Sequence, residues 1–186
     1  ADESKFYIFL PKEKESPFFY YYAIDANSTI LQDKTYFKVT IPEIPLPANL
    51  SRSEWVYRKF MFFQNKIHLF IIYYAKFTTL KGQFIKFVSY IYYVQYSRDG
   101  KELSRRYLFP PTDGSIIPAD FSVAINNNRR IHLAWTDGKD YNPVGGGGPG
   151  LGLDFPMEIY YLILNENGEP LVSQIRLTEL DNKDSK

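Results

Sequence analysis

Ile67-His68-Leu69 returns in this chain as Ile131-His132-Leu133, 64 residues later, and Ile91-Tyr92-Tyr93 returns as Ile159-Tyr160-Tyr161, 68 residues later. A polar turn and a leucine follow each Ile-Tyr-Tyr at the same distance. A fainter copy begins at Phe19-Tyr20-Tyr21. Repeats with a period of some tens of residues indicate an array of like structural units. This repetition decides the architecture that we expect.

The composition favours strands over helices, because the chain has 16 Tyr and 15 Phe among many Ile and Val. Short apolar runs alternate with turn residues from one end to the other. Helical periodicity is nearly absent, and residues 51–59 could hold at most one helical turn. A proline-rich connector follows the first three strands. The expected strands are residues 6–10, 18–24, 35–40, 56–63, 66–74, 87–96, 103–109, 121–125, 130–136, 158–164 and 172–178.

These strands fall into repeat units at about residues 5–41, 55–111 and 120–179. The second and third units each contain four strands in up-and-down order, and the first contains three. Successive four-stranded antiparallel meanders are typical of the blades of a β-propeller. We therefore expect an all-β, β-propeller-like fold of about three blade units, the first incomplete, in a single domain or domain fragment. A β-sandwich is the alternative.

The third unit carries a resemblance to a known family. It contains an Asn-rich turn, Ile-His-Leu-Ala-Trp-Thr-Asp-Gly from residue 131, Glu-Ile-Tyr-Tyr from residue 158, an Asn-Gly-Glu hairpin and Arg-Leu-Thr. This pattern resembles the blades of sialidase-like β-propellers of archaeal and bacterial surface proteins. It is clearest over residues 121–180, partial over 56–111 and faint over 5–40. The resemblance implies propeller-like sheets that bind at a cell surface. The sialidase Asp-box, Ser-x-Asp-x-Gly-x-Thr-Trp, does not occur in the chain, so the resemblance gives little support to glycosidase activity.

Charge and cysteine content exclude several classes of protein. The chain has no cysteine, which excludes a disulfide scaffold, a thiolate metal site and a cysteine nucleophile. The formal net charge is +1 with acids and bases interspersed, so no nucleic-acid partner is expected. The longest apolar run, residues 67–75, is too short to span a bilayer.

Two features favour a secreted or cell-surface protein. The sequence opens at Ala1 rather than Met, as it would after removal of a signal peptide, although a chain cut at a domain boundary would begin in the same way. Asn27 and Asn49 lie in Asn-x-Ser/Thr sequons within expected loops, so both are candidates for glycosylation.

The segment that follows the second Ile-His-Leu is the candidate ligand-binding site. Trp135, Asp137, Asp140 and Tyr141 place an indole, two carboxylates and a phenol where a strand runs into a long loop. Aromatic and carboxylate groups together suit a sugar ring, or a calcium ion if backbone carbonyls join them. The alternative is a packed Trp followed by an Asp-Gly turn.

His68 and His132 occupy equivalent repeat positions between apolar neighbours, which favours a structural role over metal binding. No metal, cofactor or catalytic residue is assigned. The Tyr and Phe runs are predicted to pack in the core, with stacking platforms for bases or sugars as the alternative.

The sequence thus predicts a non-enzymatic binding or assembly protein, such as a surface-layer component, an adhesin or a propeller module. Its partners would be protein or glycan at the cell surface, or further copies joined through open sheet edges. The alternative is a glycoside hydrolase or lyase on the same scaffold. That enzyme would require acids such as Asp113, Asp137 and Asp154 to converge.

Overall fold

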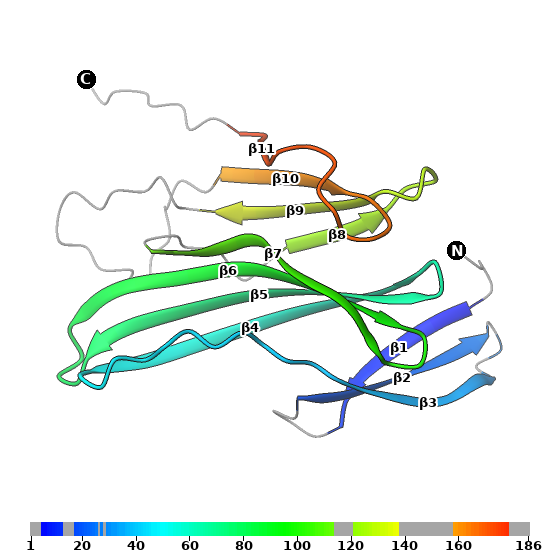
Figure 1. The fold of residues 1–186 in the computed structure, drawn as a ribbon, viewed down its shortest axis with the longest axis horizontal. Helices are drawn as coiled ribbons and strands as arrows, with labels where there is room; N and C mark the ends of the chain where they lie inside the picture. The colour runs from blue at the N-terminus through cyan, green and yellow to red at the C-terminus, as the bar shows by residue number, and fades with distance from the viewer. Residues whose placement is uncertain are drawn as a thin grey trace. The chain divides into compact units, whose positions relative to one another are not determined.

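The computed structural model describes residues 5–12, 17–25, 27, 29–113, 121–137 and 158–178. Within these ranges the chain is all-β, without a helix, and forms three open antiparallel sheets (Figure 1). Each sheet has two edge strands, and none closes on itself into a barrel. The expectation of an all-β chain is therefore confirmed.

Sheet A has the order β1-β2-β3 and consists of β1 (Lys5–Pro11), β2 (Phe18–Asp25) and β3 (Ile30–Lys38). Successive side chains along β2 point to opposite faces of the sheet, as in any strand. Phe19, Tyr21 and Ala23 are buried on one face, whereas Phe18 is 43% exposed on the other. The Tyr and Phe run at the start of β2 therefore contributes to both faces of the sheet.

Sheet B has the order β4-β5-β6-β7 and contains β4 (Leu50–Phe63), β5 (Lys66–Thr79), β6 (Phe84–Ser97) and β7 (Glu102–Asp113). These strands are longer than the sequence predicted. Residues 51–59, where the sequence allowed one helical turn, form none, because that segment is part of β4. Pairing with a neighbouring strand fixes the extended backbone whatever the local preference.

Sheet C has the order β11-β10-β9-β8, with β8 (Phe121–Ile125), β9 (Ile131–Asp137), β10 (Glu158–Leu164) and β11 (Ile175–Arg176). On its buried face, residues of β8, β9 and β10 lie directly opposite one another in rows. One such row consists of Phe121, Trp135 and Tyr160, and the next consists of Val123, Leu133 and Leu162.

The turns show how the sequence closes its hairpins. The side-chain oxygen Oδ1 of Asn126 accepts hydrogen bonds from the backbone N–H groups of Asn128 and Arg130, and Asn165 makes the equivalent bonds in the next hairpin. Such side-chain acceptors substitute for backbone acceptors in tight turns. The left-handed residue of the first turn is Arg129, with φ of 60°, so Asn acts there as an acceptor and not as the left-handed residue.

Two compact units divide the chain, and the boundary between them crosses the long strands of sheet B. Unit 1 comprises Ala1–Pro45, Arg58–Phe70 and Tyr93–Arg106, and unit 2 comprises Leu46–Tyr57, Ile71–Tyr92 and Tyr107–Lys186. This boundary does not coincide with a boundary between repeats.

The core of unit 1 is a stack of aromatic rings between sheet A and the unit's part of sheet B. The rings of Tyr7 and Phe62 stack with centroids 4.0 Å apart, and those of Phe9 and Phe60 stack at 4.9 Å. The hydroxyl of Tyr21 donates to the carbonyl of Arg98 at 2.5 Å. Aromatic pairs contribute beyond the area they bury, so one face of sheet A is firmly held in this core.

In unit 2, the rings of Tyr73 and Tyr90 stack 4.7 Å apart, nearly parallel. The Tyr73 hydroxyl donates to Glu54 Oε2 at 2.6 Å, and the guanidinium of Arg52 also contacts this carboxylate. Burial, followed by the hydrogen bond to Glu54, raises the pKa of Tyr73. Tyr73, Tyr90 and Tyr92 are at most 5% exposed, so core packing is confirmed for these tyrosines.

Candidate functional site

The first candidate site surrounds Trp135, which the structure places within β9. Trp135 is 3% exposed and its indole stacks on Tyr160 with centroids 5.9 Å apart. This burial agrees with the packed-Trp alternative. Asp137 ends β9 opposite Glu158, but its side chain is outside the described part, as are Asp140 and Tyr141. The convergence of these groups on one ligand stays a prediction.

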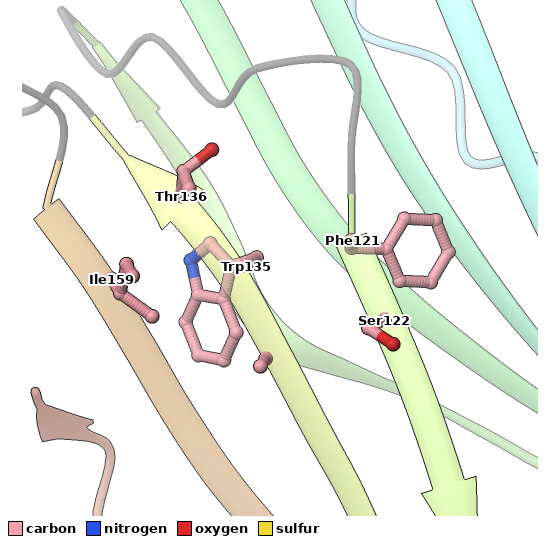
Figure 2. Close-up of a pocket in the computed structure, with 6 residues that line it drawn as sticks. Phe121, Ser122, Trp135, Thr136 and Ile159 are labelled. Carbon is pink, nitrogen blue, oxygen red and sulfur yellow. The ribbon is translucent and has the colours of Figure 1, made fainter.

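A shallow hollow of about 180 Å³ lies beside Trp135 on sheet C (Figure 2). Ser122 and Ala134 oppose each other across β8 and β9, and these small side chains leave room between their larger neighbours. Ser122 and Thr136 contribute the side-chain hydroxyls of the lining, and no lining residue carries a charge. The hollow can accept a small apolar group. It is lined by Phe121, Ser122, Ala134, Trp135, Thr136 and Ile159.

On the buried face of sheet C, which also carries Trp135 and Tyr160, lies a buried carboxylate that sequence reasoning missed. Glu158 is 1% exposed, forms an ion pair with Arg176 and accepts a hydrogen bond from the Tyr160 hydroxyl at 2.8 Å. A buried charge needs such partners, because desolvation strongly disfavours a lone one. The arrangement ties the two-residue strand β11 to β10. The signal was available in the sequence, since Glu158 occupies an inward position of an alternating strand.

The two histidines each contact a tyrosine of their own repeat. His68 Nδ1 lies 2.8 Å from the Tyr93 hydroxyl, and His132 Nδ1 makes the same contact with the Tyr161 hydroxyl. The ring centroids of the two pairs lie 6.0 Å and 5.8 Å apart. The repeated Ile-His-Leu and Ile-Tyr-Tyr motifs therefore encode one repeated cross-strand contact.

The environment of His68 fixes its protonation. Its Nε2 lies 3.3 Å from the carbonyl of Phe63, which can only accept, so Nε2 carries the proton and Nδ1 accepts from Tyr93. The pKa of His68 is lowered to about 4, chiefly by burial; the hydrogen bond to Phe63 raises the pKa and nearby Lys66 lowers it. His68 is therefore neutral at pH 7. No group of three or more metal-ligating His, Asp or Glu residues occurs in the described part of the chain.

The second candidate site is the face of sheet A that points away from the core of unit 1. On this face, Ile8 is 39% exposed, Leu10 40% and Tyr36 53%. The ring of Tyr20 contacts those of Tyr22 and Tyr36 at 5.4 Å and 5.8 Å between centroids. We call this the outer face of sheet A, and its described side chains are Ile8, Leu10, Phe18, Tyr20, Tyr22, Tyr36 and Lys38, with Ile24 and Ile30 at one end.

The sequons lie on exposed turns. Asn27 is between β2 and β3, where its backbone N–H donates to Asp25 Oδ1, and Asn49 directly precedes β4. Glycans at either position would project into solvent. Whether they are carried stays a prediction.

Comparison with known proteins identifies no relative, since no family model, curated protein or solved structure matches the chain. In the residues that the structure describes, no helix is long and apolar enough to cross a membrane.

Proposed function

We propose that this chain is a non-enzymatic binding or assembly protein of the cell surface. The observation that carries the proposal is the outer face of sheet A. In an antiparallel sheet with one buried face, the other face ordinarily carries polar side chains. Here the described side chains of the outer face are also apolar, apart from Lys38, and Phe18, Tyr36 and Ile30 are 43%, 53% and 61% exposed. Contiguous exposed apolar surface marks sites of interaction.

Two chemistry-bearing side chains that the structure describes, His68 and Glu158, have structural partners, which also favours binding over catalysis. His68 is neutral and hydrogen-bonded at both ring nitrogens, and Glu158 is paired with Arg176. A glycoside hydrolase would need two carboxyl groups set across a sugar-binding cleft. The side chains of Asp113, Asp137 and Asp154, the acids proposed for that alternative, lie outside the described part.

For the architecture, we propose propeller-like repeats. The packing of sheet A against the unit 1 part of sheet B, through pairs such as Phe9 and Phe60, supports this proposal because neighbouring propeller blades pack face to face. The same packing would arise in a β-sandwich. The repeated His–Tyr contact favours an array of like units, and the exposed turns at Asn27 and Asn49 suit a glycosylated surface protein.

The test combines binding and catalysis in one preparation. The purified chain is incubated with cell envelopes of the organism that makes it, and the sedimented protein and the released reducing sugar are both measured. We expect saturable sedimentation without sugar release, and weaker sedimentation for Tyr36→Lys. Leu80→Lys is the matched control, because Leu80 is 71% exposed in the turn between β5 and β6. Sugar release that increases with enzyme concentration would replace this proposal with the hydrolase.

A further inference from the structure

We infer that the outer face of sheet A is a self-association surface, whose occupant is the same face of a second copy of this chain. The inference rests on the proposed function, since it names the partner for that surface. The argument has three steps: the chemistry of the face, its size and its symmetry.

The chemistry of the face selects an apolar partner. Among the strand positions of this face with described side chains, Lys38 is the only charged residue. A nucleic acid or an anionic membrane would require several basic groups. A sugar would require flat exposed rings with polar side chains beside them. Tyr20 instead meets Tyr22 and Tyr36 edge-on, with interplanar angles of 77° and 62°.

The size of the face suits a reversible dimer. Three strands of about seven residues cover about 23 Å by 14 Å, given the rise per residue and the spacing of strands. Side chains project from this plane, so two copies would together bury on the order of 1,000 Å², the lower limit for a specific interface. We therefore expect a dimer that dissociates on dilution.

Symmetry makes the second copy a sufficient partner. The same patch on two copies can meet about a twofold axis, which closes the assembly at a dimer and covers the outer face of sheet A on both copies. Two sheets that pack in this way lie about 10 Å apart. The central strand β2 presents the aromatic Phe18, Tyr20 and Tyr22, and β1 presents the aliphatic Ile8 and Leu10. Rings and branched side chains can therefore interleave across the axis.

The experiment measures solution mass by light scattering over a tenfold range of concentration, for the full chain and for Leu10→Lys. We expect the wild-type mass to rise toward that of a dimer, and Leu10→Lys to weaken association about tenfold or more, because a buried unpaired ammonium is strongly disfavoured. Leu80→Lys should associate like wild type. An unchanged melting temperature for Leu10→Lys would show that its fold is retained.

A second measurement depends on the absence of cysteine from the chain. Leu10→Cys should be joined into a covalent dimer by a short bismaleimide, and Leu80→Cys should not. A monomer at every concentration, or association that Leu10→Lys leaves unchanged, would overturn the inference. If such a chain still sediments with envelopes, the proposed function stands without it. Loss of both properties from the wild-type chain would overturn both.

Discussion

His68 Nδ1 lies 2.8 Å from the hydroxyl oxygen of Tyr93, at the centre of a buried chain of hydrogen bonds. The amide of Gln95 donates to the same hydroxyl at 3.2 Å, and His68 Nε2 donates to the Phe63 carbonyl. These three hydrogen bonds each pair a donor with an acceptor, so the network favours one arrangement of His68, Tyr93 and Gln95. Its partly exposed counterpart, His132 with Tyr161, provides a natural control.

Tyr93→Phe should lower the free energy of unfolding by about 1–3 kcal/mol, because it leaves buried His68 Nδ1 without its donor. Tyr161→Phe should cost less than about 1 kcal/mol, since water can replace the lost hydroxyl at a partly exposed site. Urea denaturation of both variants checks the order. Equal losses of unfolding free energy would mean that burial does not make the His68–Tyr93 contact more important for stability than the His132–Tyr161 contact.

His68 should remain neutral well below the ordinary titration range of histidine. Its pKa is lowered to about 4 in the folded protein, below the unfolded value of 6.5, so the unfolded state binds the proton first as the pH falls. Stability from this group is fully present above pH 6.5 and is lost as the pH falls toward 4, by on the order of 3 kcal/mol in total. The ring-proton NMR shift of His68 should stay constant from pH 7 down to about pH 5.

The chain has only two histidines, so His132→Asn identifies the His68 resonance by elimination. A midpoint near the unfolded value for that resonance would contradict a buried, neutral His68.

Gly100 lies in a hairpin that closely approaches sheet A, and Gly82 serves as the comparison without such a neighbour. Both adopt a left-handed backbone, with φ of 83° and 84°. A Cβ on Gly100 would lie 2.5 Å from the backbone oxygen of Tyr36, whereas a Cβ on Gly82 would meet nothing within 4 Å. Gly82→Ala should therefore cost about 1 kcal/mol for its backbone conformation alone. Gly100→Ala should cost a further 1–3 kcal/mol or so for the clash.

Thermal and urea unfolding of the two variants give the difference directly. Similar losses would show that the hairpin yields to the added methyl group without cost.

The sequence predicted elements best where a strand is short and its neighbours are close in sequence. The bounds of β8 and β10 agree with the residues expected, 121–125 and 158–164, because apolar alternation and turn residues mark both ends. The long strands of sheet B were predicted too short. Residues 76–79 lack a clear apolar alternation, and their extension comes from pairing with a neighbouring strand, which local patterns do not encode.

The candidate sites show the same contrast between features set by local sequence pattern and features set by strand pairing. Which face Trp135 occupies could be read from alternation, but the ion pair between Glu158 and Arg176 joins residues 18 positions apart and depends on the register of β11. The apolar outer face of sheet A could not be predicted either. The continuous run of Phe and Tyr at the start of β2 is compatible with a strand buried on one face and with a strand buried on both. Only the packing of Phe19 against Phe60 and of Tyr21 against Phe62 separates the two sets.

Glu158 and Arg176 should respond unequally to the removal of each partner. Arg176→Met leaves a buried carboxylate with the Tyr160 hydroxyl alone, and should cost about 3–5 kcal/mol. Glu158→Gln removes the charge but keeps a polar group of the same shape. It should cost about 1–3 kcal/mol, because Arg176 is 40% exposed and can turn toward water.

The double variant should be more stable than Arg176→Met alone, because it no longer buries an unpaired charge. Urea denaturation of the two single variants and the double variant completes the cycle. Additive losses would show that the two side chains do not interact, and that β11 is held to β10 by its backbone alone.

Trp135→Phe should retain most of the stability of the chain, whereas Trp135→Ala should lose about 3–5 kcal/mol through the cavity left in sheet C. The indole N–H of Trp135 has no hydrogen-bond partner among the described residues, so replacing it with phenyl removes no bond within them. The stacking on Tyr160 can be kept by either ring. We also expect Trp135→Phe to sediment with envelopes like the wild type. If it keeps its stability but no longer sediments, the indole itself is part of a binding site. The role of Trp135 as core packing would then be wrong.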